Sequence, residues 1–191
     1  MYRYLISCLM ILAVILVAGA YFFRDYWEHR YDELITRQAR VYHLDEKLVW
    51  SIIYEETYFR AWKVGEADEV GLMQVTPLVA RDWARETGLS EFERQANENV
   101  NAFLSDPERN IQIGCWYFEK LRERYRGHLA ETAMTLAAYN AGPSRVEEWV
   151  REGDASSMTE ADFISRINIP STSSYITSIL QRYRAQQGKT K

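Results

Sequence analysis

Two adjacent glutamates, Glu55 and Glu56, stand at the end of a predicted helix whose apolar stripe consists of Leu48, Val49, Ile52 and Ile53. At about 100° per residue, Glu56 falls within roughly 10° of the centre of this stripe, whereas Glu55 lies about 90° away. Glu56 is therefore predicted to point inward. Burial against an apolar wall disfavours the carboxylate and raises its pKa, as a general acid working near neutral pH requires. The alternative is a last-turn glutamate that pairs with an arginine or faces solvent.

A second candidate is the segment Gly71-Leu72-Met73-Gln74-Val75-Thr76-Pro77. Gly71 allows the backbone to approach a ligand closely, and the Gln74 amide can both donate and accept hydrogen bonds. This combination is typical of a substrate-binding turn. The alternative is a tight loop in which Leu72 and Met73 fill the core.

Small residues followed by two polar ones form a third candidate, Leu136-Ala137-Ala138-Tyr139-Asn140-Ala141-Gly142-Pro143. The hydroxyl of Tyr139 could orient a carboxyl group or hydrogen-bond a sugar. A close-packed helix that ends at Gly142-Pro143 explains the same pattern without a ligand.

The elements that must position these residues are helices. Past residue 25, apolar residues recur at three- and four-residue intervals without sustained alternation, which predicts an all-α domain. Starts are predicted from Asp45, Thr76-Pro77 and Asp106-Pro107, and a capping box from Ser144 with Glu147. The expected helices cover about 26–42, a segment after Asp45, 76–87, 107–126, 129–140, a segment from Ser144 and 173–186.

The N-terminal stretch, residues 4–23, carries no formal charge. Twenty helical residues span roughly the 30 Å of a hydrocarbon core, so it is a transmembrane helix or a signal peptide. Ala18-Gly19-Ala20 is compatible with signal cleavage, but the apolar run continues through Phe23 and favours an uncleaved anchor. Positive residues stand on both sides and leave the orientation open.

The composition excludes several classes of protein. With 191 residues, 47% of them hydrophobic and 26% charged, the chain suits one short segment plus one compact domain. A net charge of -4 offers no basic patch for nucleic acid. Cys8 lies in the apolar N-terminal stretch, far from Cys115, so no disulfide is expected within the domain, and the three histidines lack metal-ligand spacing, so no zinc site is expected.

Four ordered blocks carry a resemblance to a known family over residues 40–180. They are Ser51-Ile52-Ile53-Tyr54-Glu55-Glu56-Thr57-Tyr58-Phe59; Gly71-Leu72-Met73-Gln74; Asp106-Pro107-Glu108-Arg109-Asn110-Ile111 with Gly114; and Ala137-Ala138-Tyr139-Asn140-Ala141-Gly142. Together they resemble the catalytic domain of soluble lytic transglycosylases, related to goose-type lysozyme in glycoside hydrolase family 23.

The resemblance implies a lysozyme-like all-α domain at 43–187, after an anchor at 1–25 and a linking helix at 26–42. It implies cleavage of peptidoglycan glycan strands by Glu56 as the single acid/base, through a 1,6-anhydro ring closed by the C6 hydroxyl of N-acetylmuramic acid. Because that nucleophile is tethered, a second carboxylate is not needed, and the resemblance calls for no metal or cofactor. Residues implied to bind substrate are Thr57, Gly71, Met73, Gln74, Tyr139, Asn140 and Tyr175. Such a domain is expected to be membrane-anchored and extracytoplasmic, with an envelope protein complex as an unidentified further partner.

The chain also departs from the family pattern. Gly65 replaces a common serine, Thr76 replaces a common methionine, and the segment from Pro170 to Tyr175 lacks a glutamate and an arginine often found there. Two alternatives therefore stay open. One is a hydrolytic muramidase in which an acidic residue of 65–69 positions water; the other is a catalytically silent glycan-binding or scaffold subunit.

Overall fold

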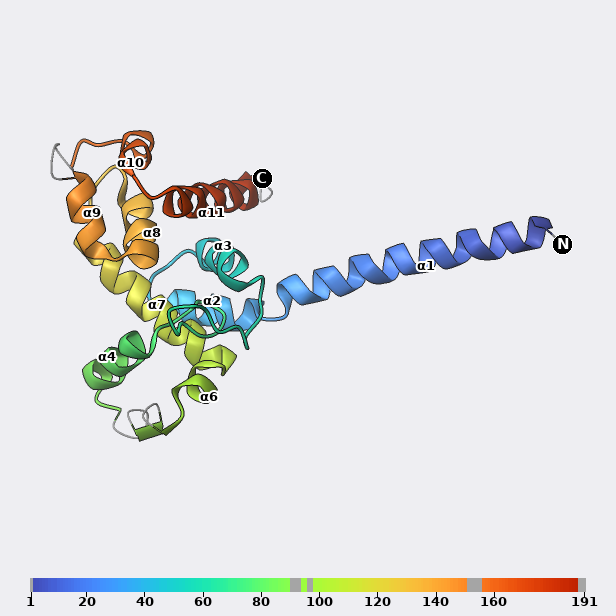
Figure 1. Ribbon diagram of the computed structural model, residues 1–191, viewed down its shortest axis with the longest axis horizontal. Coiled ribbons are helices and arrows are strands. Elements are labelled where there is room, and N and C mark those ends of the chain that lie inside the picture. The colour runs from blue at the N-terminus through green and yellow to red at the C-terminus, as the bar shows by residue number, and fades with distance from the viewer. Residues whose placement is uncertain (1, 90–93, 96–97, 151–155, 189–191) are drawn as a thin grey trace.

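The computed structural model describes residues 2–89, 94–95, 98–150 and 156–188, and these form helices joined by loops. No strand occurs among them, only isolated bridges from Val70 to Val64 and Val75. Figure 1 shows α1 projecting away from a bundle formed by the other helices. In chain order the helices are α1 (Tyr2–His29), α2 (Asp32–Val41), α3 (Glu46–Thr57), α4 (Pro77–Thr87), α6 (Val100–Leu104), α7 (Pro107–Arg124), α8 (Glu131–Ala141), α9 (Pro143–Val150), α10 (Glu160–Arg166) and α11 (Pro170–Gly188).

Three predicted helix starts are confirmed. Asp45, Thr76 and Asp106 each accept a hydrogen bond from a backbone N–H two or three residues further on, at 2.8, 3.3 and 2.9 Å. Prolines occupy the first turns of α4 and α7, where no intrahelical partner for an N–H exists. These local signals set where the helices around the site begin.

Three helix boundaries differ from expectation. The linking helix expected at 26–42 is divided, because α1 continues to His29 and the chain then turns onto the domain before α2 starts at Asp32. Helix α9 starts at Pro143, so Ser144 lies inside it and does not cap it, and α11 starts at Pro170 rather than at 173. In both of these helices a proline takes the first turn, for which its fixed φ is suited.

The domain is organised around α3 and α7. Helix α3 packs against α11 and α2, while α7 packs against α8, α2 and α4. The apolar stripe predicted for α3 is buried, and Val49, Ile52 and Ile53 have no exposed surface. Alanines on α8, including Ala137 and Ala138, are also fully buried and allow neighbouring helices to approach closely. The last turns of α3 and α8 and the first turns of α11 are therefore held together by one packed core.

Helix α1 is the one described helix that is long and apolar enough to cross a membrane, and its apolar part is not buried by the domain. Its apolar side chains, among them Leu12, Val14 and Leu16, are exposed on every side. An exposed apolar surface of this length is of the kind that a hydrocarbon core can cover.

Candidate active site

Glu56 lies in the last turn of α3 and points toward α11, where the Tyr175 hydroxyl donates a 2.6 Å hydrogen bond to its Oε1. Glu55 points elsewhere and forms an ion pair with Arg182, with 2.9 Å between Oε2 and the guanidinium nitrogen. The helical phase thus separated the two glutamates as predicted. The alternative of pairing with an arginine applies to Glu55.

Burial raises the pKa of Glu56 from 4.5 to about 7. The Tyr175 hydrogen bond and the positive charge of Lys63 act in the opposite direction, and the charges of Glu69 and Glu55 add to the increase. Lys63 is held close by because its ammonium group donates to the Glu56 backbone carbonyl at 2.5 Å. Near neutral pH this carboxyl group can both donate and accept a proton.

Two tyrosines from different helices border the Glu56 carboxyl group. Tyr139 of α8 donates its hydroxyl to the Met73 carbonyl oxygen at 2.7 Å. Burial, followed by the charge of Glu56, raises the pKa of both Tyr139 and Tyr175 well above the ordinary value. Both hydroxyls therefore stay protonated and act as neutral hydrogen-bonding groups beside the carboxyl.

The loop of residues 71–74 is held by Asn110, a fully buried residue of α7. Its Oδ1 accepts from the Met73 N–H at 2.7 Å, and its Nδ2 donates to the Val70 and Leu104 carbonyls at 2.7 and 2.8 Å. Gly71 has a φ of +79°, and a Cβ there would lie 2.3 Å from the Asn110 Nδ2. Only glycine fits this close approach.

The Gln74 side chain is partly committed to its own loop, since its Nε2 donates to the carbonyls of Gly71 and Lys63 at 3.0 and 3.2 Å. Its backbone adopts a φ of +46°, which is uncommon for a residue with a side chain. Its side-chain oxygen has no part in these two bonds. Contact of Gln74 with substrate remains a prediction.

Thr57 and Met73 lie behind the site rather than in it. The Thr57 hydroxyl is buried and lies 3.2 Å from the Leu72 carbonyl, which links α3 to the loop. Met73 is fully buried and packs where a side chain at Gly114 would otherwise stand. Their expected contact with substrate stays a prediction, while their contacts here position the loop.

Asn140 joins α8 to the start of α11, because its Oδ1 accepts from the Thr172 hydroxyl at 2.8 Å. Thr172 is buried one helical turn before Tyr175, so this bond helps to place the tyrosine that contacts Glu56. Sequence reasoning missed Thr172 and Lys63. The spacing of Thr172 from Tyr175 was a usable signal, whereas nothing local indicated the contact of Lys63 with Glu56.

Gly65, one of the departures from the family pattern expected from the sequence, is covered by the side chain of Glu69. A Cβ at Gly65 would lie 2.1 Å from the Glu69 Oε1, and the other carboxylate oxygen accepts from the Ala67 N–H at 2.8 Å. The Glu69 carboxylate thus occupies the space beside Gly65, and its charge raises the pKa of Glu56.

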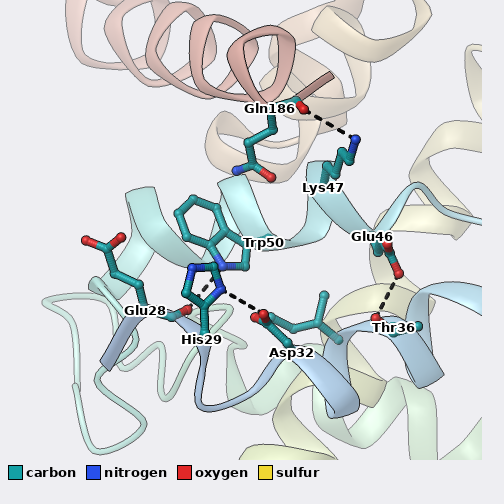
Figure 2. A pocket seen from close by; sticks show the side chains of 9 residues that line it. Glu28, His29, Asp32, Thr36, Glu46, Lys47, Trp50 and Gln186 are labelled. Carbon is teal, nitrogen blue, oxygen red and sulfur yellow. Dashed lines mark hydrogen bonds and ion pairs between the residues drawn. The ribbon is translucent and has the colours of Figure 1, made fainter. Parts of the chain in front are cut away.

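A separate cavity of about 430 Å³ lies between α1, α2, α3 and α11 (Figure 2) and contains none of these residues. Its walls include His29, Trp50 and Lys47. Within the described residues, no group of three or more His, Cys, Asp or Glu side chains is placed to hold a metal ion.

The all-α domain and the partly buried Glu56 carboxyl group between two tyrosines agree with the lysozyme-like class expected from the sequence. Comparison with known families agrees as well. The family described as Transglycosylase SLT domain matches residues 33–161, and the chain belongs to this family. The resemblance found in the sequence is confirmed.

Known relatives include two proteins called membrane-bound lytic murein transglycosylase C. That of Edwardsiella ictaluri is 30% identical over 124 residues, covering 62% of this chain and 33% of the relative. That of Histophilus somni is 32% identical over 122 residues, covering 61% and 32%. The matching region thus spans about a third of the length of these relatives.

Solved structures of lytic transglycosylases have the same fold. An inactive mutant of Slt from Pseudomonas aeruginosa superposes with a TM-score of 0.69 at 23% identity, covering 81% of this chain and 23% of that one. The 70 kDa soluble lytic transglycosylase of Escherichia coli gives 0.68 at 24% identity, covering 90% and 27%. The prediction of an all-α, lysozyme-like domain behind one long apolar helix is confirmed.

Proposed function

We propose that this protein is a peptidoglycan lytic transglycosylase that cleaves the β-1,4 bond between N-acetylmuramic acid and N-acetylglucosamine without water. The observation that carries the proposal is Glu56, whose pKa of about 7 and hydrogen bond from Tyr175 suit a group that must donate and then accept a proton. Family membership supports the substrate class.

In the proposed reaction, protonated Glu56 donates its proton to the glycosidic oxygen as the bond from C1 to that oxygen breaks. The resulting carboxylate removes the proton from the C6 hydroxyl of the same N-acetylmuramic acid. The C6 oxygen then bonds to C1, which closes the 1,6-anhydro ring and returns Glu56 to its acid form. Because the attacking hydroxyl belongs to the substrate, proximity replaces a second catalytic carboxylate.

The remaining predicted site residues have two proposed roles. Gln74, Tyr139 and Tyr175 are proposed to contact the sugar. The two tyrosines interact with the Glu56 carboxyl group, and Gln74 bonds the carbonyl of Lys63, whose ammonium group bonds the Glu56 carbonyl. Thr57, Gly71, Met73 and Asn140 are proposed to bind substrate through the backbone that they hold in place, since their side chains are committed to internal contacts or absent. No cofactor is part of this scheme.

Mass spectrometry of purified sacculi digested by the protein tests the proposal. Muropeptides that end in 1,6-anhydro-N-acetylmuramic acid are the expected products. Reducing-end products alone would show that water, not the C6 hydroxyl, is the nucleophile. Binding to sacculi without any cleavage would instead support a glycan-binding scaffold.

A hydrolytic muramidase is the second candidate, and the position of Glu69 favours it. Its carboxylate fills the space over Gly65 and is close enough to raise the pKa of Glu56, so it could orient a water molecule. Digestion in ¹⁸O-labelled water separates the two reactions, because only hydrolysis introduces the label at C1. Under this alternative, Glu69→Gln would lower label incorporation.

We also propose that α1 anchors the protein in the cell membrane, with the domain on the extracytoplasmic side where peptidoglycan lies. The exposed apolar surface of α1 supports the anchor, as do the relatives named membrane-bound. The side of the membrane follows from the proposed substrate.

The pH dependence of cleavage should change in Tyr175→Phe. Cleavage by the wild type is expected to fall as pH rises through about 7, because the general acid is lost. The Tyr175 hydrogen bond lowers the Glu56 pKa, so its removal should move this fall in kcat/KM to higher pH. A loss of about tenfold or less in kcat is expected for one neutral hydrogen bond.

The matched control is Tyr183→Phe, on the same helix, since the Tyr183 hydroxyl bonds Asp45 at 2.8 Å and has no contact with Glu56. Its pH profile should equal that of the wild type. A Tyr175→Phe profile that coincides with both would mean that Tyr175 does not act on the catalytic carboxyl.

A further inference from the structure

The end of α1 is attached to the residues that directly follow α3, the helix that carries Glu56. The indole N–H of Trp27 donates to the Tyr58 carbonyl at 2.9 Å, and the Arg30 guanidinium donates to the carbonyl of Phe59. The Tyr58 hydroxyl in turn lies 3.1 Å from the Glu28 carboxylate. Tyr58 and Phe59 both have positive φ, so these bonds hold an uncommon backbone conformation.

A second set of contacts holds α1 from the side of α3. The Trp50 indole donates to the Glu28 carbonyl at 3.1 Å, and its ring lies against that of His29 with 6.2 Å between centroids (Figure 2). His29 also contacts Asp32 at 2.7 Å, across the turn between α1 and α2. With contacts on two sides, the domain has one orientation relative to the α1 axis.

This attachment brings exposed aromatic rings of the domain and of α1 together. Trp62, in the loop of residues 60–64, is 62% exposed and packs edge-on against Trp27 with 5.8 Å between ring centroids. Phe23 packs on Trp27 at 5.8 Å, and Tyr26 is exposed nearby on α1. A tryptophan with this much exposure leaves a large apolar surface uncovered.

The depth of these rings matches the edge of a bilayer. The uncharged stretch of α1 ends at Phe23, and Trp27 lies about 6 Å further along the helix axis. Headgroup regions extend roughly 5 to 8 Å beyond the hydrocarbon core on each side. Trp27, and Trp62 packed against it, therefore fall at headgroup level, where tryptophan and tyrosine are enriched.

We propose that the loop of residues 60–64 rests in the headgroup region of the bilayer crossed by α1, with Trp62 as its main lipid contact. The partner is the phospholipid interface itself. This inference rests on the membrane anchoring proposed above, and it adds that the catalytic domain lies on the membrane in a fixed orientation instead of moving freely on a tether.

Fluorescence quenching in liposomes of phosphatidylcholine and phosphatidylglycerol tests the inference with the full chain. In a Cys8→Ser background, a polarity-sensitive fluorophore is attached at Trp62→Cys or, as a control, at Leu78→Cys. Leu78 is equally exposed, at 61%, but lies on α4, at the end of the domain away from α1 (Figure 1). Cys115 is fully buried, and burial raises the pKa of its thiol, so it should not react.

A lipid carrying a spin label near its headgroup should quench the fluorophore at 62 about threefold more than at 78. Val64→Cys, which keeps Trp62 in place, should behave like Trp62→Cys. Equal quenching at all three positions would overturn the inference.

A fluorophore on the native Cys8, within α1, reports anchoring separately through a spin label deep in the acyl chains. Quenching at Cys8 together with equal quenching at 62 and 78 would overturn the lipid contact and leave the anchor intact. Absence of quenching at Cys8 would overturn both proposals.

Discussion

Glu56→Gln is expected to lower the rate of glycan cleavage by about 10³-fold, the middle of the range for a general acid–base group. The amide keeps the size of the side chain and can still accept from the Tyr175 hydroxyl, but it has no proton to donate at the pH of the assay. Release of anhydromuropeptides from sacculi, measured at saturating substrate, gives the change in kcat.

Glu55→Gln is the matched control, because it removes the same charge one residue earlier. Glu55 pairs with Arg182 away from the Tyr175 hydroxyl, and the two side chains are 26% and 25% exposed, so its loss should change kcat less than tenfold. Retained cleavage in Glu56→Gln, or equal losses in both variants, would remove Glu56 from its proposed role.

Glu56→Gln should not destabilise the fold at alkaline pH. Glu56 binds its proton up to a pKa of about 7 in the folded protein and up to 4.5 when unfolded, so the folded state binds more protons in between. Wild-type stability should therefore fall as pH rises from 4.5 to about 7. Glu56→Gln lacks this loss, and its melting temperature at pH 8 should equal or exceed that of the wild type.

Asn110→Ala should be the most destabilising of the substitutions considered, with a loss of about 3 to 5 kcal/mol in the free energy of unfolding. Three backbone groups, at Met73, Val70 and Leu104, would lose their buried partner, and a cavity would remain. Urea unfolding followed by circular dichroism measures the change. Cleavage should fall too under conditions where the variant is folded, since the loop at 71–74 loses its support.

Asn101→Ala serves as the control for this variant. Asn101 is exposed on α6, and its replacement should change the free energy of unfolding by less than about 0.5 kcal/mol. A loss below about 1 kcal/mol in Asn110→Ala would show that the loop is held by other contacts.

The parts of the fold that the sequence predicts are those with local causes. Apolar spacing indicated the helices, Asp45 and Asp106 marked two of their starts, and helical phase distinguished Glu56 from Glu55. Each of these depends on residues within one or two turns of one another. The differences at Pro143 and Pro170 are local as well, because a proline fits the first turn of a helix as readily as it ends one.

The contacts that complete the site could not be predicted in the same way. Tyr175 meets Glu56 across 119 positions of the chain, and Asn110 meets Met73 across 37. Such contacts depend on how whole helices pack, which periodicity does not encode. The resemblance named Tyr175, but the cover that Glu69 provides over Gly65 became evident only from the arrangement in space.

Under the proposed membrane anchoring, the direct connection of α1 to the domain also limits how far from the bilayer the proposed cleavage can occur. With Trp27 bonded to Tyr58 and Glu56 two residues before it, the Glu56 Cα lies no more than about 25 Å from the end of the apolar stretch of α1. A molecule anchored through α1 in this orientation has no flexible linker that could increase this distance. We therefore expect cleavage to be confined to the glycan strands nearest the membrane. Lateral diffusion in the bilayer would bring the protein to new strands, and the outer layers of the wall would stay uncut.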